Sequence, residues 1–202
     1  MGTVIAITSG KGGTGKTSIT GGVAASLSLM GRRVLCVDMD IGLRNLDISL
    51  GLNDRALMDF SDVALGRCPL ARAAVEHPDL NGLFLLTSPM TQPASLTADK
   101  VRALLEEARS GYDYILIDAP AGLGGGFRLA TCAADRAIVI ATNDASSLRD
   151  AQRTVAELDH LRTIHLVMNR IQAKLLRKLR ATIDDAMDAA GLPLIGVVPE
   201  DP

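Results

Sequence analysis

A glycine-rich segment at residues 10–17, Gly-Lys-Gly-Gly-Thr-Gly-Lys-Thr, constrains this chain more than any other feature. It follows an apolar run at residues 4–8 and precedes a segment with helical character. Glycines clustered between a strand and a helix let the backbone approach a ligand closely, and the amides of a helix N-terminus attract anions. The segment therefore predicts a phosphate-binding loop at the carboxyl end of the first strand.

This loop fits two phosphate-binding motifs. Residues 10–15 satisfy G-x-G-x-x-G, and Asp38 ends the second predicted strand at about the ~20-residue spacing of a ribose-binding acid in dinucleotide-binding enzymes. Residues 10–17 also satisfy G-x-x-x-x-G-K-[ST], the P-loop. A triphosphate with Mg²⁺ needs a cation at its β- and γ-phosphates and a hydroxyl on the metal, and Lys16 and Thr17 supply both. We therefore favour ATP with Mg²⁺, and an NAD-dependent oxidoreductase is the alternative from another class.

The apolar runs predict the fold class. They read as strands at residues 4–8, 34–37, 83–86, 114–117, 137–141, 164–168 and 194–198. Most are uninterrupted, as in strands covered on both faces. Between them, residues 101–108 and 148–158 carry apolar side chains at helical spacing. The alternation predicts one α/β domain over residues 1–202, a P-loop NTPase with a mainly parallel sheet and helices on both faces.

Carboxylates at strand ends complete the predicted chemistry. A P-loop site needs an acid at the end of a buried strand to hold the water shell of the metal, and Asp118 follows the run at residues 114–117. Thr17, Asp38 and Asp118 form the predicted Mg²⁺ site. Asp40, just past the second strand, is the candidate for orienting the water that attacks the γ-phosphate. For Asp38 and Asp40 the alternative is a cap on a helix or turn.

Composition argues against several other classes. The net charge of -2 gives no whole-protein reason to expect DNA or acidic lipid as a partner. Only 2% of residues are aromatic, which leaves little for stacking on bases. No signal peptide is visible, and the uncharged run at residues 18–31 is too short and too polar to span a bilayer. A basic segment with Lys174, Arg177, Lys178 and Arg180 is interpreted as a solvated helix face, with membrane or DNA binding as the alternative.

Lys11 adds a second cation that a general P-loop does not require. With it, residues 11–17 resemble the K-G-G-x-G-K-[ST] loop of the deviant Walker-A ATPases of the MinD/ParA type. The resemblance extends over essentially the whole chain and includes Asp-Met-Asp-Ile-Gly-Leu-Arg-Asn-Leu-Asp at 38–47, Asp-Ala-Pro-Ala-Gly at 118–122, Ser-Ser-Leu-Arg-Asp at 146–150, Asn-Arg at 169–170 and Pro-Glu-Asp at 199–201.

The resemblance implies an ATPase that forms a homodimer when it binds ATP and Mg²⁺ and uses slow hydrolysis as a timer, in placement of the bacterial division septum. Lys11 then reaches the phosphates of the partner subunit, as an arginine finger does in trans, while Lys16 serves its own site. A ParA-type DNA partition ATPase is the alternative within the family. The net charge disfavours it, and so does the absence of Pro-Gln-Gly after Asp40.

The same resemblance implies which residues hold the nucleotide. The phosphates lie on the loop and the start of its helix, at Gly10, Lys11, Gly12, Gly13, Thr14, Gly15, Lys16, Thr17 and Ser18. Gly122 offers its backbone N–H to the γ-phosphate. The adenine lies between two strand ends, at Asn169, Arg170, Pro199, Glu200 and Asp201.

Partners and location also follow from the resemblance. Regulatory proteins of the MinC and MinE type are expected to dock on Arg44, Asn45, Asp47 and the region of Asp150. Members of the family continue beyond Pro-Glu-Asp into an amphipathic membrane helix that these residues do not include. We therefore expect a cytoplasmic location, peripheral to the inner membrane where the native C-terminus carries such an anchor, and no binding to nucleic acid.

Overall fold

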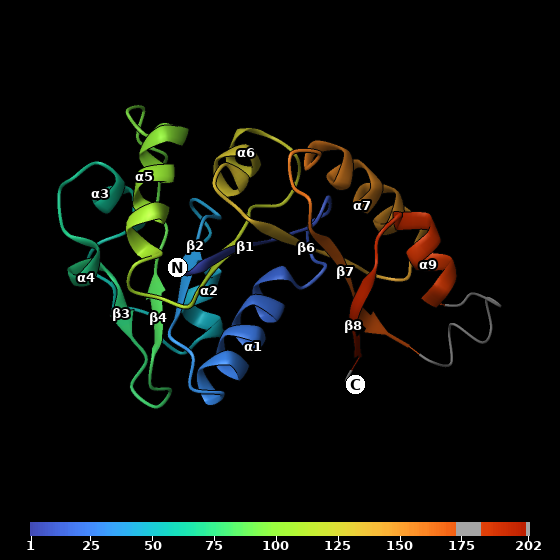
Figure 1. Ribbon diagram of the computed structural model, residues 1–202, viewed down its shortest axis with the longest axis horizontal. Coiled ribbons are helices and arrows are strands. Elements are labelled where there is room, and N and C mark those ends of the chain that lie inside the picture. Colours follow the sequence, from blue (N-terminus) through green and yellow to red (C-terminus); the bar gives the residue numbers. More distant parts are fainter. Residues whose placement is uncertain (173–182, 201–202) are drawn as a thin grey trace.

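One eight-stranded sheet carries the fold in the computed structural model, which describes residues 1–172 and 183–200 (Figure 1). Its order is β3-β4-β2-β5-β1-β6-β7-β8, and every neighbouring pair is parallel except β3 with β4. The strands are β1 (Thr3–Thr8), β2 (Val34–Asp38), β3 (Val75–Glu76), β4 (Leu83–Leu86), β5 (Tyr114–Asp118), β6 (Arg136–Ala141), β7 (Ile164–Ile171) and β8 (Leu194–Pro199). The predicted, mainly parallel sheet is confirmed, and all seven predicted runs are strands.

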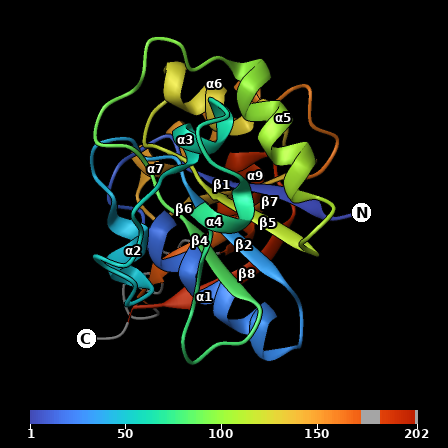
Figure 2. The same cartoon turned by 90° about the vertical axis from the view of Figure 1, so that its left-hand side faces the viewer.

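Helices cover both faces of this sheet, as predicted. One face carries α1 (Lys16–Leu29) and α2 (Asn45–Ser49). The other carries α3 (Phe60–Ala64), α4 (Leu70–Ala73), α5 (Ala98–Ala108), α6 (Gly125–Thr131), α7 (Ala145–Glu157) and α9 (Ile183–Ala190). Figures 1 and 2 show α1 on one side of the strands, with α5 and α6 opposite it.

The central strands bury side chains on both faces. In β2, Leu35 and Val37 pack under α5, whereas Val34 and Cys36 pack on the side of α1, and all four are fully buried. This two-sided burial explains why the strands read as uninterrupted apolar runs. Each buried aliphatic side chain of this kind stabilises the fold by about 1.5–3 kcal/mol, so the centre of the sheet is a rigid base for the loops at its edge.

Parallel pairing brings the carboxyl ends of three central strands to one edge. Ile7 of β1 and Asp38 of β2 both lie in register with Asp118 of β5. The glycine loop leaves β1 at this edge and leads directly into α1. Ligands of open α/β sheets bind at such an edge, so the predicted site residues are gathered where the fold favours binding.

Two further observations bear on membranes. In residues 1–172 and 183–200, no helix has the length and apolar character needed to cross a bilayer. The basic residues Lys174, Arg177, Lys178 and Arg180 lie outside the described residues.

Candidate nucleotide-binding site

The glycine loop leaves the N-terminus of α1 open to an anion. Gly15 caps α1 with a φ of 92°, in the left-handed region, and provides no side-chain capping hydrogen bond. The first turn of α1 also lacks acidic residues. Its amide groups and the positive end of its dipole therefore face whatever lies in the loop, which is the arrangement that phosphate requires.

Two loop glycines also meet close neighbours. A Cβ on Gly10 would lie 2.4 Å from the carbonyl oxygen of Asp150, and one on Gly15 would lie 2.3 Å from Nδ2 of Asn169. Neither position can hold a side chain without displacing its neighbour. The loop is thus packed between the start of α7 and the end of β7, and Asp150 supports the loop through its backbone.

Lys16 points into this loop and is largely buried, with 7% of its surface exposed. Its ammonium donates to Oγ of Ser9 at 3.1 Å, and the Ser9 hydroxyl donates to the carbonyl of Lys11 at 2.6 Å. Burial lowers the pKa of Lys16, while the charges of Asp118 and Asp40 oppose that shift. Ser9 is not among the predicted site residues, because its only signal in the sequence is its position between the strand and the first glycine.

Asp118, the predicted metal ligand, lies buried at the carboxyl end of β5. It is 1% exposed, and Oγ1 of Thr20 donates to it at 3.4 Å. Burial raises its pKa to about 6, and a hydrogen bond from Thr17 opposes the shift. The Thr17 hydroxyl and the Asp118 carboxylate are hard oxygen donors of the kind that Mg²⁺ takes beside phosphates. These residues fit the expected metal.

Asp38, the other predicted carboxylate at the metal site, also bonds to the backbone that follows β2. One carboxylate oxygen accepts the backbone N–H of Asp40 at 2.9 Å, and the other accepts that of Leu46 at 3.2 Å. Asp38 therefore fixes the segment after β2, which is the capping alternative weighed above. Burial raises its pKa to about 7, with Asp118 adding to the shift. Its carboxylate lies at the metal edge with both oxygens already engaged.

Asp40 is half-buried, and burial raises its pKa while the charge of Lys16 opposes that shift. Its backbone carbonyl accepts from Leu43 and from Oγ of Ser88. Within the part of the chain that the structure describes, no hydrogen bond reaches its carboxylate. The charge of Lys16 therefore acts on Asp40, whose carboxylate oxygens remain available to accept hydrogen bonds from a water molecule.

Lys11 lies on the outside of the loop. Its ammonium is 3.0 Å from Oγ of Ser146 and 3.4 Å from Oδ1 of Asp144, at the start of α7. Asp144 also caps α7 by accepting the N–H of Ser147, and the hydroxyls of Ser146 and Thr142 hold its pKa well below the usual range. Lys11 therefore rests on a charged carboxylate of its own chain, and sequence analysis missed this partner because the contact spans 133 residues.

The loop after β5 lies beside the phosphate loop. The Cβ of Ala121 is 3.9 Å from the position that a Cβ on Gly12 would take. Gly122 follows with a φ of +85°, a conformation that favours glycine. The predicted γ-phosphate donor thus lies in a turn next to the loop that it is expected to serve.

A cavity of about 530 Å³ opens along α1 beside the end of β7. It is lined by Ser18, Ile19, Gly22, Val23, Ser26, Leu27, Asn169 and Val198. Of the residues expected to contact adenine, Asn169 lines it, together with Ser18 from the segment expected to hold the phosphates. Arg170, Pro199 and Glu200 lie exposed at the adjoining ends of β7 and β8, and Asp201 is outside the described residues.

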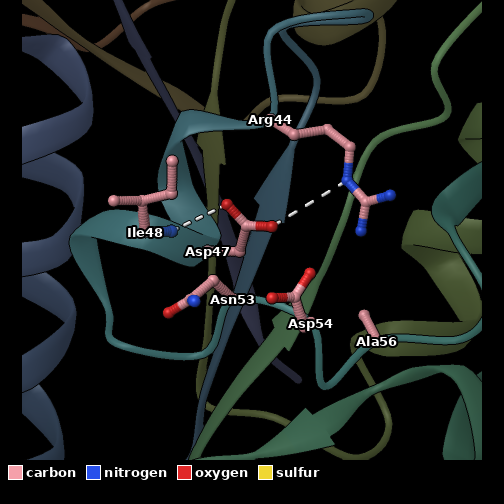
Figure 3. Close-up of a pocket in the computed structure, with 6 residues that line it drawn as sticks. All are labelled: Arg44, Asp47, Ile48, Asn53, Asp54 and Ala56. Atoms are coloured by element: carbon pink, nitrogen blue, oxygen red, sulfur yellow. Dashed lines mark hydrogen bonds and ion pairs between the residues drawn. The ribbon is translucent and has the colours of Figure 1, made fainter.

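The expected docking segment for regulatory proteins borders a second cavity of about 520 Å³ (Figure 3). Arg44 begins α2, donates from Nε to Oγ1 of Thr87 at 3.2 Å and pairs with Asp47 at 3.9 Å. Asp47 is buried and accepts the N–H of Ile48. Asn45 and Ile48 are exposed. The more accessible part of the segment is therefore Arg44, Asn45 and Ile48, whereas Asp47 lies buried in the wall of the cavity, facing Arg44.

Residues 5–202 match the family described as the CobQ/CobB/MinD/ParA nucleotide binding domain. The septum site-determining protein MinD of Helicobacter pylori is 40% identical over 212 residues, which cover 100% of this chain and 79% of that protein.

Two solved structures resemble this structure and are more than 30% identical in sequence. The MinC:MinD cell division protein complex of Aquifex aeolicus matches with a TM-score of 0.90 and 38% identity, covering 99% of this chain and 82% of that one. MinD of Pyrococcus horikoshii, complexed with Mg-ADP, matches with a TM-score of 0.86 and 31% identity, covering 100% and 83%. The chain belongs to the CobQ/CobB/MinD/ParA nucleotide-binding family, where its relatives are the septum site-determining MinD proteins.

Proposed function

We propose that residues 1–202 form one ATPase domain that acts as an ATP-dependent dimerisation switch in placing the division septum. The observation that carries the proposal is that two lysines of one loop occupy different positions. Lys16 is buried inside the loop beside Asp118 and Asp40, whereas Lys11 lies outside it on Asp144. A P-loop that serves its own site requires only Lys16, so we assign the outer lysine to the site of a partner subunit.

The residues of the chain divide the chemistry among them. The amides of the loop and the Lys16 ammonium hold the phosphates, and Thr17 and Asp118 hold Mg²⁺, with Asp38 keeping the neighbouring segment in place. Bound Mg²⁺ supplies positive charge against the β- and γ-phosphate oxygens. Asp40 orients the attacking water, and Lys11 leaves Asp144 to neutralise charge at the site of the partner subunit.

The adenine, the regulatory partner and the cellular location can be assigned in the same way. The cavity beside Asn169 takes the adenine, because its walls are mostly aliphatic and one amide can read the edge of the base. Arg44, Asn45 and Ile48 offer a docking surface for a regulatory protein of the MinC type, since the Aquifex aeolicus relative forms a complex with MinC. The location is cytoplasmic, and peripheral to the inner membrane where the native protein carries a membrane anchor.

Ligand titration and molar mass together test this function. Calorimetry with ATP and Mg²⁺ should give one site per chain, and light scattering after size exclusion should show a dimer with ATP but a monomer with ADP. ADP is the matched control, because it fills the same site without the γ-phosphate. Tight binding of NAD without Mg²⁺ would instead support the oxidoreductase alternative, and a monomer in saturating ATP would remove the switch.

A further inference from the structure

The end of β7 is irregular, and this irregularity directs the side chain of Asn169 toward the phosphate loop. The register between β7 and β8 shifts between Met168 and Ile171, and Arg170 has a φ of 55°. Bulges of this kind re-aim side chains at the edges of sheets. Here Arg170 is exposed, whereas Asn169 is 6% exposed and turned into the molecule.

Asn169 makes a buried hydrogen bond to the loop. Its Nδ2 donates to the backbone carbonyl of Thr14 at 2.8 Å. The same nitrogen lies against Gly15, where a Cβ would approach it to 2.3 Å. The last two residues before α1 are thus clamped by a side chain 155 residues away.

This bond fixes the direction of one peptide group. In a trans peptide, the C=O and the following N–H point in opposite directions. Because the Thr14 carbonyl points at Asn169, the N–H of Gly15 points away from Asn169. Gly15 has no side chain of its own with which to cap α1, so the orientation of this peptide decides how the loop presents its amides to an anion.

We propose that Asn169 is a positioning residue for the phosphate loop, in addition to its place at the base cavity. Its amide locks the Thr14–Gly15 peptide so that the loop is preorganised before a nucleotide arrives. The inference rests on the proposed function, because it assumes that the loop binds phosphates. A positioning role affects every ligand that binds the phosphate loop, whereas a role in base recognition affects only ligands that have a base.

Inorganic tripolyphosphate, which has no base, separates these two roles. Calorimetry with Mg²⁺ is carried out on wild type, Asn169→Ala and Asn169→Asp, with tripolyphosphate and with ATP. Loss of one buried hydrogen bond should weaken tripolyphosphate about fivefold in Asn169→Ala. Asn169→Asp should lose roughly tenfold or more, because a carboxylate cannot donate and repels the carbonyl. Tripolyphosphate affinity equal to wild type in both variants would overturn the proposal.

Hydrogen exchange without any ligand provides a second readout. Peptides covering residues 12–18 should take up deuterium faster in Asn169→Ala than in wild type, while the strands of the central sheet exchange as before. The matched control is Gln172→Ala, which removes an exposed amide that bonds Glu200 at the same strand end and should change neither readout. Unchanged uptake over residues 12–18 in Asn169→Ala would contradict the proposal. Failure of the proposed function is a separate result, since wild type would then bind neither tripolyphosphate nor ATP.

Discussion

Asp38 and Asp118 occupy paired positions at the carboxyl ends of the adjacent strands β2 and β5, where 0% and 1% of their surfaces are exposed. Burial raises the pKa of Asp38 to about 7 and that of Asp118 to about 6. The two carboxylates also repel each other, which adds to the shift of Asp38. Without a bound cation, the fold therefore holds two charges in a place that disfavours them.

The ligand-free protein should accordingly be more stable at pH 5 than at pH 8. Both groups have folded-state pKa values above the unfolded value of about 4, so their stabilising contribution is present below pH ~4 and is lost as pH rises through about 6 and 7. Thermal melts across this range measure the trend. Asp118→Asn should flatten it, stabilise the apo protein at pH 8 by roughly 1–3 kcal/mol and weaken the Mg²⁺ dependence of ATP binding. Equal slopes for wild type and Asp118→Asn would contradict this account.

The two lysines of the loop should fail in different ways. Lys16→Ala removes the buried cation and should weaken ATP binding itself. Lys11→Ala should leave binding to the monomer close to wild type but abolish dimerisation and hydrolysis, because its ammonium lies outside the loop. Calorimetry and light scattering on both variants give the comparison. Equal binding defects would remove the proposed role of Lys11 in trans.

Asp144→Asn should favour the dimer. The substitution keeps an oxygen that can cap α7 but removes the charge on which Lys11 rests. About half of each side chain in this pair is exposed, so one ion pair contributes at most ~1 kcal/mol. A symmetric dimer breaks two such pairs, so the dimer constant should rise no more than about 30-fold. Sedimentation equilibrium in ATP and Mg²⁺ measures it. A weaker dimer would mean that Asp144 itself contributes to the interface.

Arg109 and Asp135 should matter for stability far from the site. Two N–H groups of Arg109 donate to Asp135 at 2.5 and 3.0 Å, and Asp135 also accepts the N–H of Val4. The Arg109 side chain is 10% exposed and that of Asp135 is 41% exposed, so Asp135→Asn should lower the free energy of unfolding by about 1–2 kcal/mol. Asp99→Asn breaks an exposed pair with Arg102 and should change it by less than about 0.5 kcal/mol. Urea titrations that give equal effects would contradict the prediction.

The fold was predictable because the local pattern of apolar residues identifies its strands and helices. Uninterrupted apolar runs follow from strands such as β2, which are buried on both faces, whereas β3 is too short at two residues to produce a pattern. Contacts between distant segments leave no such signal. The bond from Asn169 to Thr14 and the pair between Lys11 and Asp144 depend on how loops meet at the sheet edge. The burial of Asp47 was missed for the same reason.

Asp40 is the residue on which the proposed hydrolysis depends. Its carboxylate lies in the field of Lys16, and the hydrogen bonds at this residue are made by its backbone. A carboxylate that orients water acts on the transition state more than on the ground state, so Asp40→Ala should slow hydrolysis while sparing ATP affinity. Loss of one such group slows the reaction on the order of 10²-fold, roughly 3 kcal/mol.

Slower hydrolysis should trap the dimer. In size-exclusion chromatography with ATP and Mg²⁺, Asp40→Ala should remain dimeric long after wild type has returned to monomer, because the ATP state persists. Asp118→Ala is the matched control at the same edge of the sheet. It disturbs the metal position, so Mg²⁺-supported binding should suffer and no trapped dimer should form. An Asp40→Ala protein that hydrolyses ATP at the wild-type rate would leave Asp40 without a catalytic role, and the water would then have to be oriented by another group.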